Sequence, residues 1–93
     1  MATMHNPASP GELLREFLAD RTVSDLAAHI GVARTTISRV LNGRAAVTVE
    51  MSIRLGQALD LSPDFFSRAQ LQYDHWRARR TKRPRIERFD AAA

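Results

Sequence analysis

Apolar residues recur at spacings of three and four along most of the chain, which is the period of an amphipathic helix. No stretch alternates apolar and polar residues for long enough to predict a strand. Residues that start or stop helices divide the pattern into five segments, so we predict an all-α protein of five helices. The predicted helices cover residues 9–20, 24–30, 34–41, 48–60 and 62–80.

The expected helix starts carry hydroxyl side chains, which can accept hydrogen bonds from the first turn. These predicted caps are Ser9, Ser24, Thr48 and Ser62. Glu12 completes a capping box with Ser9. Pro10 and Pro63 each follow a predicted cap, where the fixed φ of proline suits the first helical position. Asn42-Gly43 is a strong break signal and should end the third helix.

Each helix carries an apolar face that should turn toward the core. The residues expected to point inward are Leu13, Leu14, Phe17 and Leu18; Leu26, Ala27 and Ile30; Ile37, Val40 and Leu41; and Met51, Ile53, Leu55, Ala58 and Leu59.

Residues 23–42 hold two short helices joined by a tight turn at Gly31-Val32. Glycine suits such a turn because it adopts a left-handed conformation at little cost. Ala27, four residues earlier, is small enough for the two helices to cross closely. This arrangement is typical of a helix-turn-helix, whose second helix enters the major groove of DNA. The alternative is an ordinary helical hairpin inside a bundle.

With its apolar residues turned inward, the helix over 34–41 presents small and cationic side chains to solvent. The candidates for base contact are Arg34, Thr35, Ser38 and Arg39, with small Ala33 allowing a close approach. Arginine can form a bidentate contact to guanine, and asparagine can do so to adenine. The candidates for phosphate contact at the helix ends are Thr36, Asn42, Gly43 and Arg44. The alternative for each is a solvated helix surface.

A chain of 93 residues buries only a small hydrophobic core and usually needs a disulfide, a metal site or a partner chain for additional stability. It has no cysteine for a disulfide, so we expect self-association. The predicted dimer contacts lie on the last helix and are Phe65, Phe66, Ala69, Tyr73 and Trp76. A dimer would also place two short reading helices on half-sites one DNA turn apart. The alternative is that the aromatic residues pack into the chain's own core.

The formal net charge is +4, but it is unevenly distributed. From Arg77 onward there are seven basic and two acidic residues, whereas residues 1–76 hold seven basic and eight acidic ones. We therefore predict three parts: a flexible N-terminus over 1–8, a domain over 9–80, and a flexible basic tail over 81–93. Such a tail is a candidate ligand for phosphate, and the alternative is that it only solvates the protein.

No feature of the sequence predicts catalysis or a cofactor. His5, His29 and His75 lack metal-ligand spacing, and there is no glycine-rich phosphate loop. The serines lie at predicted caps or on the reading face rather than beside a histidine and an aspartate. Without an apolar run of about 20 residues or a secretory signal, we expect a cytoplasmic protein with no membrane partner.

Several short runs between residues 10 and 77 match a known pattern: Pro10-Gly11-Glu12-Leu13-Leu14, Gly31-Val32, Thr36-Ile37-Ser38-Arg39, Leu41-Asn42-Gly43, Glu50-Met51, Arg54-Leu55, Ser62-Pro63-Asp64-Phe65, Gln70, Tyr73-Asp74 and Trp76-Arg77. In these runs the chain resembles the HigA antitoxins, a branch of the Xre and lambda-repressor-like helix-turn-helix proteins. The signature of the last helix is more specific to this branch than the shared helix-turn-helix. The chain departs from the pattern at Phe66, where the family often has tryptophan, at Asp60, where it has glycine, and in the tail after Arg79.

The resemblance implies a five-helix domain that dimerises mainly through its last helix. It implies binding to double-stranded DNA at a palindromic operator upstream of its own gene, and hence a place at the nucleoid. It also implies binding to a RelE-like or HigB-like toxin that cleaves messenger RNA. Three other interpretations compete: a stand-alone Xre-type repressor, a protein-inhibiting module whose DNA binding is vestigial, and an enzyme.

Overall fold

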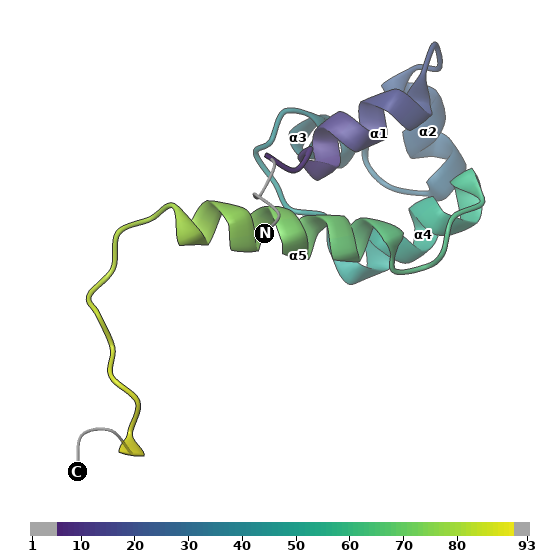
Figure 1. Cartoon of the computed structure of the whole chain (residues 1–93). Helices are drawn as coiled ribbons and strands as arrows, with labels where there is room; N and C mark the ends of the chain where they lie inside the picture. Colours follow the sequence, from purple (N-terminus) through teal and green to yellow (C-terminus); the bar gives the residue numbers. More distant parts are fainter. Residues whose placement is uncertain (1–5, 91–93) are drawn as a thin grey trace.

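The computed structural model describes residues 6–90, which form five helices and no strand (Figure 1). The helices are α1 (Pro10–Leu18), α2 (Val23–Ile30), α3 (Arg34–Leu41), α4 (Val49–Leu59) and α5 (Phe65–Arg79). The predicted all-α architecture of five helices is confirmed.

Two of the predicted helix starts are confirmed. The Ser9 hydroxyl accepts a hydrogen bond from the Glu12 N–H at 3.2 Å, and the Glu12 carboxylate accepts one from the Ser9 N–H at 2.8 Å. This is the capping box, with Pro10 as the first residue of α1. The Thr48 hydroxyl likewise accepts from the Met51 N–H at 3.1 Å at the start of α4.

The other two predicted starts are wrong. The cap of α2 is Thr22, whose hydroxyl accepts from the Asp25 N–H at 3.0 Å, so Ser24 lies inside the first turn. Helix α5 begins at Phe65, because the Ser62 carbonyl accepts from the Phe65 N–H at 3.1 Å and closes a turn before the helix. Ser62 and its following proline therefore form that turn and not the first turn of α5.

Twelve apolar side chains form one core between the helices. They are Leu14, Leu18, Leu26, Ala27, Ile30, Ile37, Val40, Leu41, Val47, Met51, Leu55 and Phe66. Most of the predicted inward residues belong to this core or pack against it. Ile53 is the exception and is 36% exposed, because α4 turns Met51, Ser52 and Leu55 inward instead.

Phe66 has no exposed surface and joins α1 to α5 through an aromatic cluster. Its ring lies edge-on to those of Phe17 and Phe65, with centroids 6.0 and 5.2 Å away. Edge-to-face pairs of this kind stabilise a core by about 0.5–1.5 kcal/mol each beyond area burial. Since Phe66 is enclosed within its own chain, the prediction that it contacts a second chain is corrected.

A buried serine fixes the start of α5 on α4. The Ser52 hydroxyl donates to the Pro63 carbonyl at 2.7 Å and accepts from the Ser67 N–H at 3.0 Å, so both of its hydrogen-bonding roles are satisfied. Further along α5, the Gln70 side-chain oxygen accepts from the Val47 N–H at 2.9 Å. These bonds set the position of α5 beside the segment that joins α3 to α4.

Helix α5 runs past the other helices and continues into an extended segment that leaves the bundle (Figure 1). We call residues 81–90 the C-terminal arm; every residue in it is exposed. The arm stretches the molecule to 58 × 24 × 23 Å. The predicted flexible ends fall partly on residues 1–5 and 91–93, which lie outside the described residues. None of the helices in the described part is long and apolar enough to span a membrane.

Candidate nucleic-acid interface

The turn between α2 and α3 has the predicted geometry. Gly31 adopts a left-handed conformation with φ 74° and ψ 37°. The N–H groups of Gly31 and Val32 both donate to the Ala27 carbonyl, at 2.9 and 3.0 Å. Ala27 is only 3% exposed, so its small side chain lies where the two helices meet. The predicted helix-turn-helix bend is therefore confirmed.

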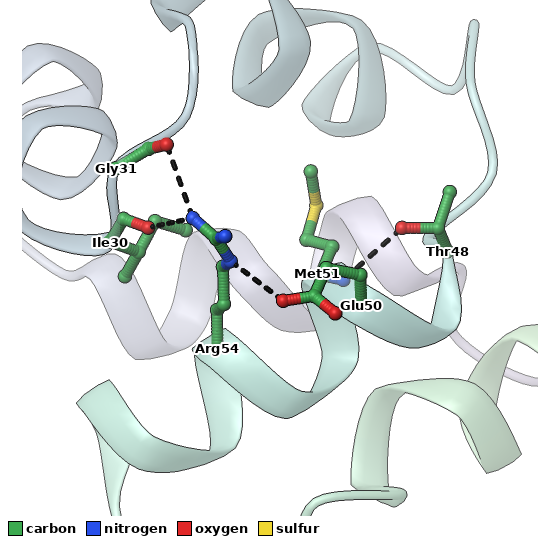
Figure 2. Close-up of polar contacts among 6 residues, drawn as sticks. All are labelled: Ile30, Gly31, Thr48, Glu50, Met51 and Arg54. Atoms are coloured by element: carbon green, nitrogen blue, oxygen red, sulfur yellow. Dashed lines mark hydrogen bonds and ion pairs between the residues drawn. The ribbon is translucent and has the colours of Figure 1, made fainter.

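Arg54 on α4 is hydrogen-bonded to the backbone of this turn (Figure 2). Its Nη1 donates to the Ile30 carbonyl at 2.9 Å and to the Gly31 carbonyl at 3.2 Å. Its Nε pairs with the Glu50 carboxylate at 3.0 Å. A cation at the C-terminus of α2 also suits the helix dipole. Sequence reasoning missed this role, because the contacts join residues more than 20 positions apart and leave no local pattern.

Helix α3 turns its apolar side inward and its polar side outward. Ile37 and Val40 are 0% and 2% exposed, which anchors the helix in the core. Of the predicted DNA-contacting residues, seven are exposed: Ala33, Arg34, Thr35, Arg39, Asn42, Gly43 and Arg44. Thr36 and Ser38 are half-buried, so they present less of their side chains to a groove. The structure thus brings all the predicted residues to α3, its N-cap and the loop that follows it.

The exposed cations of α3 are Arg34 and Arg39. Among the described residues, Arg34 and Arg39 form no side-chain hydrogen bond or ion pair. At the start of α3, Ala33 has no side chain that could cap the helix. Among the described residues, the N–H groups of Arg34 and Thr35 have no hydrogen-bond partner at this positive helix end, where a phosphate oxygen would be favoured.

The far end of α3 gains a cation that the sequence did not indicate. Arg15 on α1 donates from Nη2 to the Asn42 side-chain oxygen at 3.2 Å. Arg44 follows two residues later, after Gly43 with φ 71°, and its own N–H donates to the Arg39 carbonyl at 2.8 Å. The Arg15 guanidinium therefore lies at the C-cap of α3, two residues before the exposed Arg44. The contact spans 27 positions, so no local signal could have predicted it.

Three of the predicted dimer contacts share one side of α5. Ala69, Tyr73 and Trp76 are spaced by four and three residues and are each half-buried within the single chain. The Tyr73 and Trp76 ring centroids lie 5.9 Å apart. Phe65 is half-buried in the aromatic cluster with Phe17. The prediction did not include Leu71, which is 58% exposed on the opposite side of α5.

Comparison with known proteins settles the class of this chain. The family model for helix-turn-helix domains matches residues 12–66. The chain belongs to the helix-turn-helix family. That family membership confirms the DNA-binding regulator class inferred from residues 23–42.

The relatives of this chain include a transcriptional regulator and an antitoxin. An uncharacterized helix-turn-helix transcriptional regulator of Haemophilus influenzae is 36% identical over 80 residues, covering 83% of this chain and 75% of the relative. Antitoxin HigA-1 of Vibrio cholerae has the same identity and the same coverage. The Pseudomonas aeruginosa antitoxin HigA, solved with the higBA promoter, superposes with a TM-score of 0.74 at 33% identity, over 77% of this chain and 82% of that one. The resemblance to HigA antitoxins is confirmed.

No group of three or more histidine, cysteine, aspartate or glutamate side chains within residues 6–90 is arranged to hold a metal ion.

Proposed function

We propose that this protein is the antitoxin of a type II toxin–antitoxin pair. As a homodimer it binds a palindromic operator upstream of its own gene and represses transcription. It also binds and neutralises a RelE-like toxin that cleaves messenger RNA. This assigns the protein to the cytoplasm, at the nucleoid.

The observation that carries the DNA-binding part is the exposed face of α3 beside a fixed turn. Arg34, Thr35 and Arg39 project from a helix whose other side is buried, and no part of the described chain engages the two arginines. A rigid helix with small and cationic side chains is what major-groove recognition requires. A related HigA antitoxin was solved with promoter DNA, which supports the same use of this helix here.

Within this proposal, each residue has a distinct role. Arg39 and Arg34 read guanine edges by bidentate hydrogen bonds, and Thr35 with Ser38 contacts bases or thymine methyls. The groups at the ends of α3 bind phosphates and set the register on the duplex. These are Ala33 and Thr36 at one end, and Arg15, Asn42 and Arg44 at the other.

The toxin part is supported by the relatives with antitoxin names and by the signature of the last helix. The test is co-expression with the product of the neighbouring gene, followed by affinity capture and growth measurement. We expect the two proteins to be captured together, and growth arrest by the neighbour alone to be relieved by this chain. A neighbour that is not captured and does not arrest growth would remove the toxin part of the proposal.

The second candidate function is a stand-alone Xre-type repressor. It is favoured by the Haemophilus influenzae relative, whose name records only transcriptional regulation. Both candidates require operator binding, so a gel shift on the upstream DNA does not separate them. The co-expression experiment does, because only the antitoxin has a toxic neighbour to restrain.

A further inference from the structure

The C-terminal arm carries charge that the helix-turn-helix does not use. Four of its ten residues are cations, and two are acidic. The cations are Lys82, Arg83, Arg85 and Arg88. None of them forms an ion pair with any of the described residues, and all are exposed. Unpaired cations on an extended segment remain available to an anionic partner.

The arm begins on a helix end that is itself cationic. The guanidinium of Arg77 lies 5.6 Å from the Tyr73 ring centroid, and that of Arg80 lies 5.0 Å from the Trp76 ring centroid. Stacking on an aromatic face orients a guanidinium and leaves its N–H edge open for hydrogen bonds. Arg83 also donates to the Ala78 carbonyl, which ties the start of the arm to α5.

This cationic helix end lies beside the far end of α3. Arg77 and Arg44 line the same groove of about 200 Å³, together with Val40 and Gly43 at the end of α3 and with the acidic Asp74. Arg44 borders the face proposed to contact DNA. A strip of cations therefore leads from that face, through Arg77 on α5, into the arm.

We propose that the arm binds the phosphate backbone of DNA flanking the half-site that α3 contacts. The inference rests on the proposed operator binding and adds a second, sequence-independent contact to it. Ten extended residues span about 33 Å, close to the roughly 34–36 Å of one turn of DNA. Cations spread over residues 82–88 can then meet successive phosphates, and guanidinium groups suit phosphate oxygens well.

A protein partner is the other class of occupant for the arm. Ile86 and Phe89 are 82% and 98% exposed, and a protein groove could bury them. The charge of the arm favours DNA as the occupant. The proposed toxin cleaves messenger RNA, so it must present cations to RNA, and those cations would repel a basic arm. Variants that remove either the charge or the apolar side chains separate the two occupants.

The test is the salt dependence of binding to the chain's own upstream DNA between 50 and 200 mM salt. The full chain is compared with a variant carrying K82Q, R83Q, R85Q and R88Q. Each phosphate contact adds about 0.9 to the slope of log affinity against log salt concentration. If each arm contacts two phosphates, the affinity of the full chain should fall roughly twelvefold more per arm than that of the variant over this range. A variant with lysine at Arg83, Arg85 and Arg88 should keep the full slope, and I86S with F89S should also keep it.

The position of the contact is tested with shorter DNA. Removing about ten base pairs of flanking duplex should lower the affinity of the full chain to that of the glutamine variant and leave the variant unchanged. An unchanged salt slope in the glutamine variant, a slope lost in I86S with F89S, or indifference to flank length would overturn the inference. Equal affinity for operator and shuffled DNA would instead show that operator binding itself had failed.

Discussion

Gly11 on α1 lies so close to the Val40 carbonyl at the end of α3 that a Cβ atom there would be 2.5 Å from the oxygen. The Leu41 carbonyl oxygen would be 2.9 Å away. Both neighbours are backbone atoms, which cannot rotate aside as a side chain can. The absence of a side chain at Gly11 therefore fixes how closely α1 packs on the proposed recognition helix.

We predict that Gly11→Ala destabilises the protein by about 1–3 kcal/mol, the usual cost of overpacking, although alanine is the better helix former by about 1 kcal/mol. Operator affinity should fall as well, because α3 must shift. Urea unfolding and a gel shift measure the two effects. Gly43→Asn is the matched control, since no atom of residues 6–90 lies within 4 Å of a Cβ added at Gly43, and asparagine tolerates the positive φ there. Equal stability of Gly11→Ala and the native chain would contradict this packing.

Ala19 ends α1 in a conformation that favours glycine, with φ 56° and ψ −118°. The Leu18 carbonyl accepts from the Arg21 N–H at 3.0 Å, so Ala19 holds the first central position of a type II′ turn. Ala19→Gly should raise the free energy of unfolding by about 1 kcal/mol and the melting temperature by roughly 4–8 °C. Asp60→Gly is the comparison. Its φ of 59° and ψ of 49° are ones that aspartate tolerates, so the gain should be smaller. A lower melting temperature for Ala19→Gly would rule out this turn.

The contacts of Arg54 predict that substituting Arg54 lowers the stability more than substituting Glu50, its partner in the ion pair. Arg54→Ala removes the donor to Ile30 and Gly31 and should cost about 1–2 kcal/mol of stability. Glu50→Gln removes only an exposed partner, whose side chain is 69% exposed, and should cost less than about 0.5 kcal/mol. Operator affinity should fall in the same order, because the turn sets the angle of α3. Equal effects of the two substitutions would show that the ion pair, and not the turn contact, is what Arg54 supplies.

Self-association through α5 can be followed by tryptophan fluorescence, since Trp76 on this helix is the only tryptophan. Tyr73→Ala with Trp76→Ala should shift the protein to a monomer in sedimentation, and dilution of the native chain should change the Trp76 emission. Leu71→Ala is the informative control, because Leu71 lies on the opposite side of α5. Dissociation by Leu71→Ala, with a stable dimer in the double variant, would move the interface to that side.

Features that depend on neighbouring residues could be predicted from the sequence. The capping box of Ser9 with Glu12 and the turn at Gly31 follow from residues within a few positions of one another. The predicted cap of α2 is wrong by two residues, because Thr22 and Ser24 can each cap a helix and only the fold selects between them.

Features that depend on distant residues could not be predicted. Arg15 reaches Asn42 and Arg54 reaches Ile30 only once the helices have packed. The burial of Phe66 within its own chain is likewise a property of the assembled core. The exposed face of α3 was predictable because its apolar residues already mark which side turns inward.

Recognition of DNA bases by α3 is tested by the variant Arg39→Ala. Competition binding should be measured with the upstream DNA and a shuffled duplex of equal length, for the native chain, Arg39→Ala and the control Arg68→Ala on α5. A bidentate guanine contact is worth about 1–3 kcal/mol per half-site, so Arg39→Ala should lose its preference for the upstream DNA, with its unfolding free energy changed by less than about 0.5 kcal/mol. Arg68→Ala should keep the preference. Undiminished discrimination by a folded Arg39→Ala variant would show that α3 does not recognise the operator through this residue.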